Sequence, residues 1–282
     1  MSAIVSLTQL NIWLDVAFTS LYAVVLVALV IHFLGSIPKG RFRKKFILKK
    51  WPEHDHAPGT QPKLLHHTHM LMMIVLAISG LYIRFPFFDG GRTAMRYIHY
   101  FAMIVVTINL IWRLWYAFLS KQRDWREFAI TKEDAKSALG VILYYSYISN
   151  SKPHTSSKYN VMQKFSYQFF LVLMLMQVYT GFALVFTPIF WGYSPRDLLV
   201  GWWLGVFVGS TDLAGWYART AHYVINWLFI IMTTIHVYLS ATEDVPVTLD
   251  FFFVKDLEIK GGHGHAPEPH AVPAAGTTAG DQ

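Results

Sequence analysis

Long apolar stretches dominate the hydrophobic pattern of this 282-residue chain, and polar or charged segments separate them. A helix needs about 20 mostly apolar residues to cross the hydrocarbon core of a bilayer. The pattern therefore predicts membrane-spanning helices at residues 12–34, 64–85, 94–119, 161–186 and 216–240. Pro86 follows the second stretch, and Pro188 and Pro195 follow the fourth, as expected of helix breakers at a membrane surface. The fold class that follows is an all-α membrane protein with five transmembrane helices.

Basic residues gather in two of the intervening segments. The segment after the first helix carries Lys39, Arg41, Arg43, Lys44, Lys45, Lys49, Lys50 and Lys63, and the segment after the third carries Lys121, Arg123, Arg126, Lys132, Lys136, Lys152 and Lys158. The segments after the second and fourth helices hold only scattered charges. By the positive-inside rule, the N-terminus lies outside and the C-terminus lies in the cytoplasm. We therefore expect a multi-pass protein of the inner (plasma) membrane.

The composition limits the classes of function. The mean hydropathy is +0.35 and only 15% of the residues are charged, which is typical of an integral membrane protein. The net charge of +7 resides in the loops, where topology explains it without nucleic acid. The chain has no cysteine, which excludes disulfides and cysteine-held iron–sulfur clusters, so the 13 histidines are the obvious ligands for any redox centre.

The same patterns divide the chain into four segments. Residues 1–35 form an N-terminal transmembrane helix, which is too long and too aromatic for a cleaved signal peptide. Residues 36–63 form a basic cytoplasmic loop, residues 64–253 form a four-helix domain, and residues 254–282 form a disordered tail rich in Gly, Pro and Ala. Three histidines of the tail could catch a metal, but we expect them to belong to a flexible tail without supporting groups around a metal site; they are His263, His265 and His270. The tryptophan-rich stretch after the fourth helix is expected to lie at the headgroup level or to form a partial helix.

Two histidines in the last apolar stretch, His222 and His236, point to chemistry inside the membrane. Their spacing puts the two imidazoles within roughly 40° on one helix face and separates them by about 21 Å along the axis. His99 begins a helix at the depth of His222, whereas His66, His67 and His69 lie at the depth of His236. Two bis-imidazole sites follow, each suited to a haem iron that transfers electrons. The alternative is that these histidines hydrogen-bond between helices. His32 has no depth-matched partner, so we expect it to snorkel to the interface.

Several local patterns resemble the di-haem b-type cytochrome subunits of membrane-bound nickel–iron hydrogenases and the gamma subunits of formate dehydrogenases. His66 precedes the glycine of the pair Ser79-Gly80 by fourteen residues, and RYIHYF carries His99. KYNVMQK precedes a helix that contains QVYTGFAL, and His222 and His236 have the family's spacing and run into HVYLSATED. The similarity covers the second to fifth helices.

The resemblance implies a four-helix di-haem cytochrome b bundle plus one extra N-terminal helix. His66 and His236 would hold the cytoplasmic-side haem b, and His99 and His222 the external one. His69 is an alternative to His66, because it lies one turn away on nearly the same face, and His67 stands where the family usually has tryptophan. The arginines near the helix ends would pair with haem propionates, with interface anchoring as their alternative role; they are Arg84, Arg96, Arg113 and Arg219.

The likeness to formate dehydrogenase gamma subunits also implies a quinone site. Asn160 would hydrogen-bond a carbonyl of menaquinone or ubiquinone, with Gln163 as a second candidate. The alternative is that Asn160 caps the fourth helix. Gly80 and Gly181 fall inside membrane spans and would allow a macrocycle or another helix to approach the backbone closely.

The implied function is that of a membrane-anchoring electron-transfer subunit, not catalytic alone, in a larger hetero-oligomeric respiratory oxidoreductase. It would pass electrons between the quinone pool and an iron–sulfur subunit with its catalytic hydrogenase partner on the external face. A formate dehydrogenase or sulfur-compound reductase is the alternative partner. The first helix is additional to the common plan and would replace an anchor helix of a partner subunit. A rival from another class is a haem-free membrane anchor or transporter.

Overall fold

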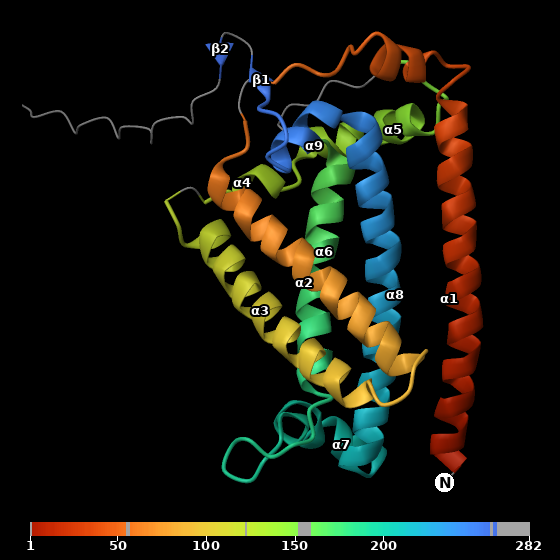
Figure 1. The fold of residues 1–282 in the computed structure, drawn as a ribbon, viewed down its shortest axis with the longest axis vertical. Coiled ribbons are helices and arrows are strands. Elements are labelled where there is room, and N and C mark those ends of the chain that lie inside the picture. Colours follow the sequence, from red (N-terminus) through yellow and green to blue (C-terminus); the bar gives the residue numbers. More distant parts are fainter. Residues whose placement is uncertain (1, 55–56, 122, 152–158, 260–261, 264–282) are drawn as a thin grey trace, which may run out of the picture.

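The structure is a computed structural model, and it describes residues 2–54, 57–121, 123–151, 159–259 and 262–263. Among these residues, five long helices run between the two ends of the molecule (Figure 1). They are α1 (Ser2–Gly35), α2 (Thr60–Arg84), α3 (Arg92–Phe118), α6 (Val161–Phe182) and α8 (Thr211–Glu243). All five are long and apolar enough to span a membrane, which confirms the predicted membrane helices.

Short elements lie at both ends of the long helices (Figure 1). One end, here called the α5 end, carries α4 (Trp125–Phe128), α5 (Lys132–Tyr145) and α9 (Val245–Phe251). The opposite end, called the α7 end, carries α7 (Leu204–Val208), which confirms the partial helix expected in the tryptophan-rich stretch. Two π-helical turns, Arg43–Ile47 and Asp197–Gly201, and the antiparallel pair β1 (Glu258–Ile259) and β2 (Gly262–His263) complete the elements in the described part of the chain.

Four of the long helices form the bundle, in which α2 packs along α3 and α6 packs along α8. Its buried centre is apolar and joins three of them; the residues are Val106, Leu110, Leu173, Met174, Ile225 and Phe229. The lipid-facing surface is also apolar, because side chains such as Ile108, Ile111 and Val172 are exposed. This two-sided apolar pattern is what a membrane bundle requires.

The ends of two helices follow from local hydrogen bonds. α8 begins after Ser210, whose hydroxyl accepts the Leu213 N–H at 3.1 Å. α6 ends at Phe182, earlier than the predicted 186, because the chain turns ahead of Pro188 and the Val185 carbonyl accepts the N–H of Arg196 at 3.1 Å.

The helix α5 was not predicted. Its N-terminus carries a capping box in which Thr131 and Asp134 satisfy each other's backbone N–H groups. Lys164 of α6 bonds Asp134 at 2.7 Å, and both side chains are almost fully buried. The hydrogen bond from Lys164 keeps the pKa of the Asp134 carboxyl below its usual value. The capping box is local, but the contact with Lys164 joins distant parts of the chain, and hydropathy alone did not reveal the helix.

The extra helix α1 packs mainly against α8, along one polar and aromatic seam. Phe18 stacks on Trp227 at a centroid distance of 6.0 Å, and the hydroxyls of Tyr22 and Thr234 lie 3.1 Å apart. Asp15 is bonded by Tyr223 of α8 and forms a 2.7 Å ion pair with Arg84 of α2. A paired intramembrane carboxylate of this kind fixes both the depth and the rotation of α1.

The expectation that His32 has no partner is wrong, whereas its snorkelling to the interface stays a prediction. Its Nδ1 lies 2.6 Å from the Tyr238 hydroxyl, and its Nε2 lies 3.0 Å from the Tyr145 carbonyl oxygen. Depth matching failed for His32 because its partners are a tyrosine and a backbone carbonyl of the unpredicted α5.

The first residues of the predicted disordered tail have a defined conformation, which the composition did not predict. Leu257 is buried, and its N–H donates to the Asp250 carboxylate at 3.4 Å. β1 then pairs with β2, which contains His263. The rest of the tail, with His265 and His270, lies outside the described residues.

Candidate functional site

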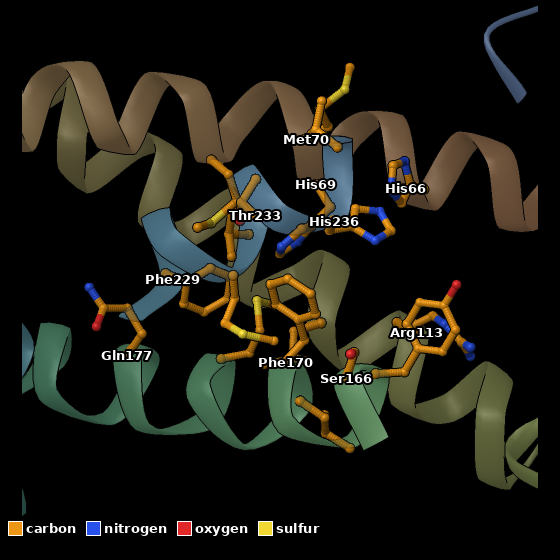
Figure 2. Close-up of a pocket in the computed structure, with 18 of the residues that line it drawn as sticks. His66, His69, Met70, Arg113, Ser166, Phe170, Gln177, Phe229, Thr233 and His236 are labelled. Carbon is orange, nitrogen blue, oxygen red and sulfur yellow. The ribbon is translucent and has the colours of Figure 1, made fainter. Parts of the chain in front are cut away.

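A cavity of about 3310 Å³ runs through the bundle and is lined by α2, α3, α6 and α8, with a contribution from α1. Ordinary pockets for small ligands measure roughly 300–1,000 Å³. All the histidines predicted as ligands line it, together with His69; they are His66, His99, His222 and His236. Figure 2 shows His66, His69 and His236 gathered in one part of this space, between α2 and α8. The cavity has room for more than one large cofactor.

The α7-end pair consists of His99 on α3 and His222 on α8, and each ring is held by the neighbouring helix. The Ser79 hydroxyl of α2 lies 2.9 Å from His99 Nδ1, and the Thr180 hydroxyl of α6 lies 3.0 Å from His222 Nδ1. Both rings line the same cavity. That His99 pairs with His222 at a haem stays a prediction.

The direction of these hydrogen bonds fixes the form of each imidazole. The Ser79 hydroxyl donates to the Val75 carbonyl at 2.6 Å, and the Thr180 hydroxyl donates to the Met176 carbonyl at 2.8 Å. Because a hydroxyl has one proton to give, its oxygen must accept from the histidine, so each Nδ1 carries the ring proton. The Nε2 lone pair of each ring is then available to a metal.

Glycines next to these hydroxyl residues let each ring approach the neighbouring helix. A Cβ atom added to Gly80 would lie 3.4 Å from His99 Cε1, and one added to Gly181 would lie 3.3 Å from His222 Cε1. A larger side chain at either place would displace the ring. The glycines therefore admit an imidazole against the backbone, which is more specific than the predicted close approach of a macrocycle or helix.

Gln177 lies where a ligand of His222 would bind. Its amide nitrogen is 3.2 Å from His222 Nε2, and its buried amide oxygen has no hydrogen-bond partner among the described residues. Nε2 accepts this contact, which agrees with a proton on Nδ1. His222 Nε2 can accept a bond, and the nearby Gln177 amide oxygen has no partner among the described residues. The geometry therefore suits a ligand that binds Nε2 in place of the Gln177 side chain.

The α5-end pair consists of His66 on α2 and His236 on α8. Their ring centroids are 6.4 Å apart. Phe251 of α9 contacts the His66 ring at 4.9 Å, and Phe170 contacts the His236 ring at 5.9 Å. No side-chain hydrogen bond joins either ring to another residue of the described ranges. Aromatic packing therefore orients this pair.

The other two histidines of α2 differ in position. His69 lines the cavity beside His66 and stays an alternative partner for His236. His67 does not line the cavity, because its Nδ1 donates to the Lys63 carbonyl at 2.6 Å and its ring packs against Phe251, Phe252 and Phe253. Of the three histidines of α2, His66 is the one whose ring contacts the ring of His236.

The residues present fit an iron porphyrin held by two imidazoles. Metal–nitrogen bonds of about 2 Å on each side, plus about 1 Å from each nitrogen to its ring centre, put the centroids roughly 6 Å apart. The observed 6.4 Å between His66 and His236 agrees with that span. The Nδ1-protonated rings of His99 and His222 supply the required donors at the α7 end.

The four predicted arginines divide by their partners. Arg113, at the α5 end, forms a two-pronged ion pair with Asp124 at 3.1 and 3.0 Å, and Arg84 pairs with Asp15. Arg96 and Arg219 line the cavity at the α7 end, and no carboxylate of the described residues lies within ion-pair distance of either. Arg219 is also close enough to Arg84, Arg96 and Arg196 to be repelled by them, so several cations gather around it.

Asn160 and Gln163 line the cavity and also form a reciprocal capping box at the start of α6. The Asn160 oxygen accepts the Gln163 N–H at 3.0 Å, and the Gln163 oxygen accepts the Asn160 N–H at 3.0 Å. The capping role predicted as the alternative is therefore confirmed. The Asn160 side chain also lies near the phenol of Tyr145 on α5.

Sequence reasoning missed three functional residues of this site. Ser79 was noted only for its neighbouring glycine, and Thr180 was not noted. A signal was present, since a hydroxyl residue followed by glycine occurs in both α2 and α6. Tyr145 lies on the unpredicted α5 and had no comparable signal.

Comparisons with known proteins agree with this geometry. The family model described as prokaryotic cytochrome b561 matches residues 60–253. A probable Ni/Fe-hydrogenase B-type cytochrome subunit of Azotobacter chroococcum is 26% identical, covering 65% of this chain and 78% of that protein. The proteins of the same name from Azotobacter vinelandii and Cupriavidus necator are 25% and 23% identical, covering 65% of this chain and 78% and 77% of theirs. No solved structure matches significantly.

Proposed function

The chain belongs to the prokaryotic cytochrome b561 family, and from this premise we propose that it is the di-haem membrane subunit of a nickel–iron hydrogenase complex. It is a multi-pass membrane protein and a b-type cytochrome, which implies haem b. The hydrogenase assignment is supported by the names of its relatives, each a probable Ni/Fe-hydrogenase B-type cytochrome subunit.

The proposal assigns one haem b to each histidine pair. His99 and His222 hold the α7-end haem, and His66 and His236 hold the α5-end haem, with His69 as the alternative to His66. Iron with two imidazole ligands supplies one-electron transfer without an open coordination position. The observation that carries the assignment is the matched arrangement at His99 and His222, where a hydroxyl and a glycine of the neighbouring helix hold each ring with its proton on Nδ1 and so leave each Nε2 unprotonated.

The protein's own groups would orient these cofactors and balance their charge. Ser79 and Thr180 keep the ring proton on Nδ1, which fixes both the tautomer and the ring plane. Arg96 and Arg219 are proposed to pair with the propionates of the α7-end haem, since they are cations on the cavity wall. Arg84 and Arg113 are weaker candidates, because Asp15 and Asp124 already pair with them.

The chain would connect a partner subunit with the quinone pool. We place the α7 end outside the inner membrane and the α5 end at the cytoplasm, since the basic loops lie at the α5 end. An iron–sulfur subunit and the catalytic hydrogenase subunit would dock at the α7 end. Menaquinone or ubiquinone would bind near the α5-end haem, beside Asn160 and Gln163, and would take two electrons and two protons to become a quinol.

Optical spectra of the purified protein test this proposal. We expect reduced-minus-oxidised difference bands of b-type haem and two haems per chain. In the complex purified with its partner, hydrogen gas should reduce both haems, and added quinone should reoxidise them. Absence of b-type bands would favour a haem-free anchor or transporter. If the bands are normal and formate reduces the haems but hydrogen does not, the partner is a formate dehydrogenase rather than a hydrogenase.

A further inference from the structure

The cavity reaches the extra helix α1 at the α5 end of the molecule. Ala28, Leu29 and His32 of α1 line it together with Tyr145 of α5 and Asn160. This wall is apolar except for a few polar groups, which suits a flat, hydrophobic ligand.

The phenol O–H of Tyr145 can donate a hydrogen bond to a ligand in the cavity. The Asn160 side chain lies near the Tyr145 phenol, but its oxygen is used by the helix cap. Within the described residues the Tyr145 hydroxyl makes no hydrogen bond, so its proton is free to donate in the cavity that Tyr145 lines. Burial, followed by the nearby Glu243 charge, raises the pKa of Tyr145, so the phenol stays protonated at physiological pH.

His32 of α1 fixes the end of α5 that carries Tyr145. A carbonyl can only accept, so His32 Nε2 donates to the Tyr145 carbonyl at 3.0 Å. The Nδ1 atom of His32 must then accept from the Tyr238 hydroxyl, at 2.6 Å. Tyr147 adds a hydrogen bond of 2.8 Å from its hydroxyl to the His32 carbonyl. One side chain of α1 thus ties the C-terminal turn of α5 to α8.

We propose that Tyr145 donates a hydrogen bond to a carbonyl oxygen of the bound quinone and that His32 is the positioning residue that holds Tyr145 in place. A quinone headgroup is planar and has two acceptor oxygens and no donor, so it needs a protonated donor of this kind. The helix α1 forms the wall of its pocket on the lipid side. This inference rests on the proposed function and adds to it a quinone ligand and a role for the extra helix.

Steady-state kinetics of the purified complex test this inference with decylubiquinone and a short-chain menaquinone analogue. Tyr145→Phe should raise KM for the better substrate about tenfold, which is the expected effect of one lost hydrogen bond to the ligand. Haem content and haem reduction by hydrogen should stay unchanged. His32→Ala should raise KM several-fold, and His32→Gln, which restores a donor near Nε2, should recover much of the loss.

Tyr144→Phe is the matched control. Its ring lies under Arg41, 3.8 Å from the guanidinium carbon to the centroid, and it does not line the cavity. This variant should keep the original KM. An unchanged KM in Tyr145→Phe, or an equal rise in Tyr144→Phe, would overturn the inference. Failure of the proposed function itself shows separately, because the unmutated complex would then lack haem or fail to reduce either quinone.

Discussion

Both histidine pairs lie in the same four-helix bundle, but different interactions orient their imidazole rings. At the α7 end, His99 and His222 each hydrogen-bond a hydroxyl that belongs to the neighbouring helix. At the α5 end, the rings of His66 and His236 are set by contacts with Phe251 and Phe170. The first pair is fixed by directional bonds within the membrane, whereas the second depends on packing.

Because of this difference, the two pairs depend on different parts of the structure. The hydroxyls and glycines at the α7 end come from the membrane helices α2 and α6, which are present whenever the bundle forms. The packing at the α5 end includes α9, which the buried ion pair of Lys63 with Asp250 ties to the start of α2 at 2.9 Å. We therefore expect the α5-end pair to respond to changes outside the membrane helices and the α7-end pair to resist them.

Removal of one histidine ligand from either pair should have the largest effect on the haem content. His99→Ala or His222→Ala should eliminate the α7-end haem, and His236→Ala should eliminate the α5-end haem, because iron then lacks one of its two imidazoles. Haem per chain, measured from pyridine haemochrome spectra, should fall from two to one. A redox titration should lose a different component in each class of variant.

The neighbours on α2 provide the controls for this measurement. His67→Ala should keep both haems, because the His67 ring bonds Lys63 and faces away from the cavity. His66→Ala should lose the α5-end haem and His69→Ala should retain it. The reverse result for His66 and His69 would transfer the ligand role to His69, and two haems in every variant would refute the assignment of both pairs.

Much of the fold was predictable because hydropathy and charge act over whole segments. The five spans and the four-helix bundle needed only runs of apolar residues. Depth alone predicted that His99 faces His222. Depth could not choose between His66 and His69, because both lie within one turn on one helix face. The rotation of α2 against α8 makes that choice, and it depends on side-chain packing.

The polar contacts between distant segments were not predictable. α5 is stabilised by Lys164, which lies thirty residues after Asp134, and His32 is bound by Tyr238 and by a backbone carbonyl. Asn160 has one contact that could be predicted from the sequence and one that could not. Its position before an apolar run predicted a helix cap, which the structure confirms, but its place near Tyr145 required the three-dimensional fold.

A bulky residue at either glycine should have the second largest effect and should act at the α7 end alone. In Gly181→Leu the added atoms would occupy the space of the His222 ring, whose Cε1 lies only 3.3 Å from the position of a Cβ. We expect this variant and Gly80→Leu to lose the α7-end haem while the α5-end haem stays. Gly181→Ala should retain both haems with a shifted potential. Equal loss of both haems would show general misfolding instead.

Breaking the ion pair that holds α9 should perturb the α5 end by a smaller amount. Asp250→Asn leaves Lys63 as an unpaired buried cation, at a cost of about 3–5 kcal/mol of stability. Loosening of Phe251 would let water reach the haem site and favour the more highly charged ferric state, so the potential of the α5-end haem should fall. Potentiometric titration should show that change without a change in the α7-end component.

Asp134→Asn tests whether that shift is specific. It breaks the other buried ion pair at the same end, with Lys164, but leaves α9 and Phe251 in place. This control should lower thermal stability in the same way and leave both potentials unchanged. A matching fall in potential in Asp134→Asn would mean that lost stability, rather than water at His66, moves the potential.

The smallest effect should come from the hydroxyls of Ser79 and Thr180, and it is the most direct test of the comparison. In Ser79→Ala or Thr180→Val the imidazole keeps its place against the glycine but loses the acceptor that holds its proton on Nδ1. Loss of such a partner typically weakens a metal site by about 10–100-fold. We expect faster loss of the α7-end haem to apomyoglobin, measured by absorbance, with both haems present at the start. Because the α5-end rings have no such bond among the described residues, the rate of loss from that site should not change. A change at both sites would mean that the hydroxyls support the whole bundle rather than one pair of ligands.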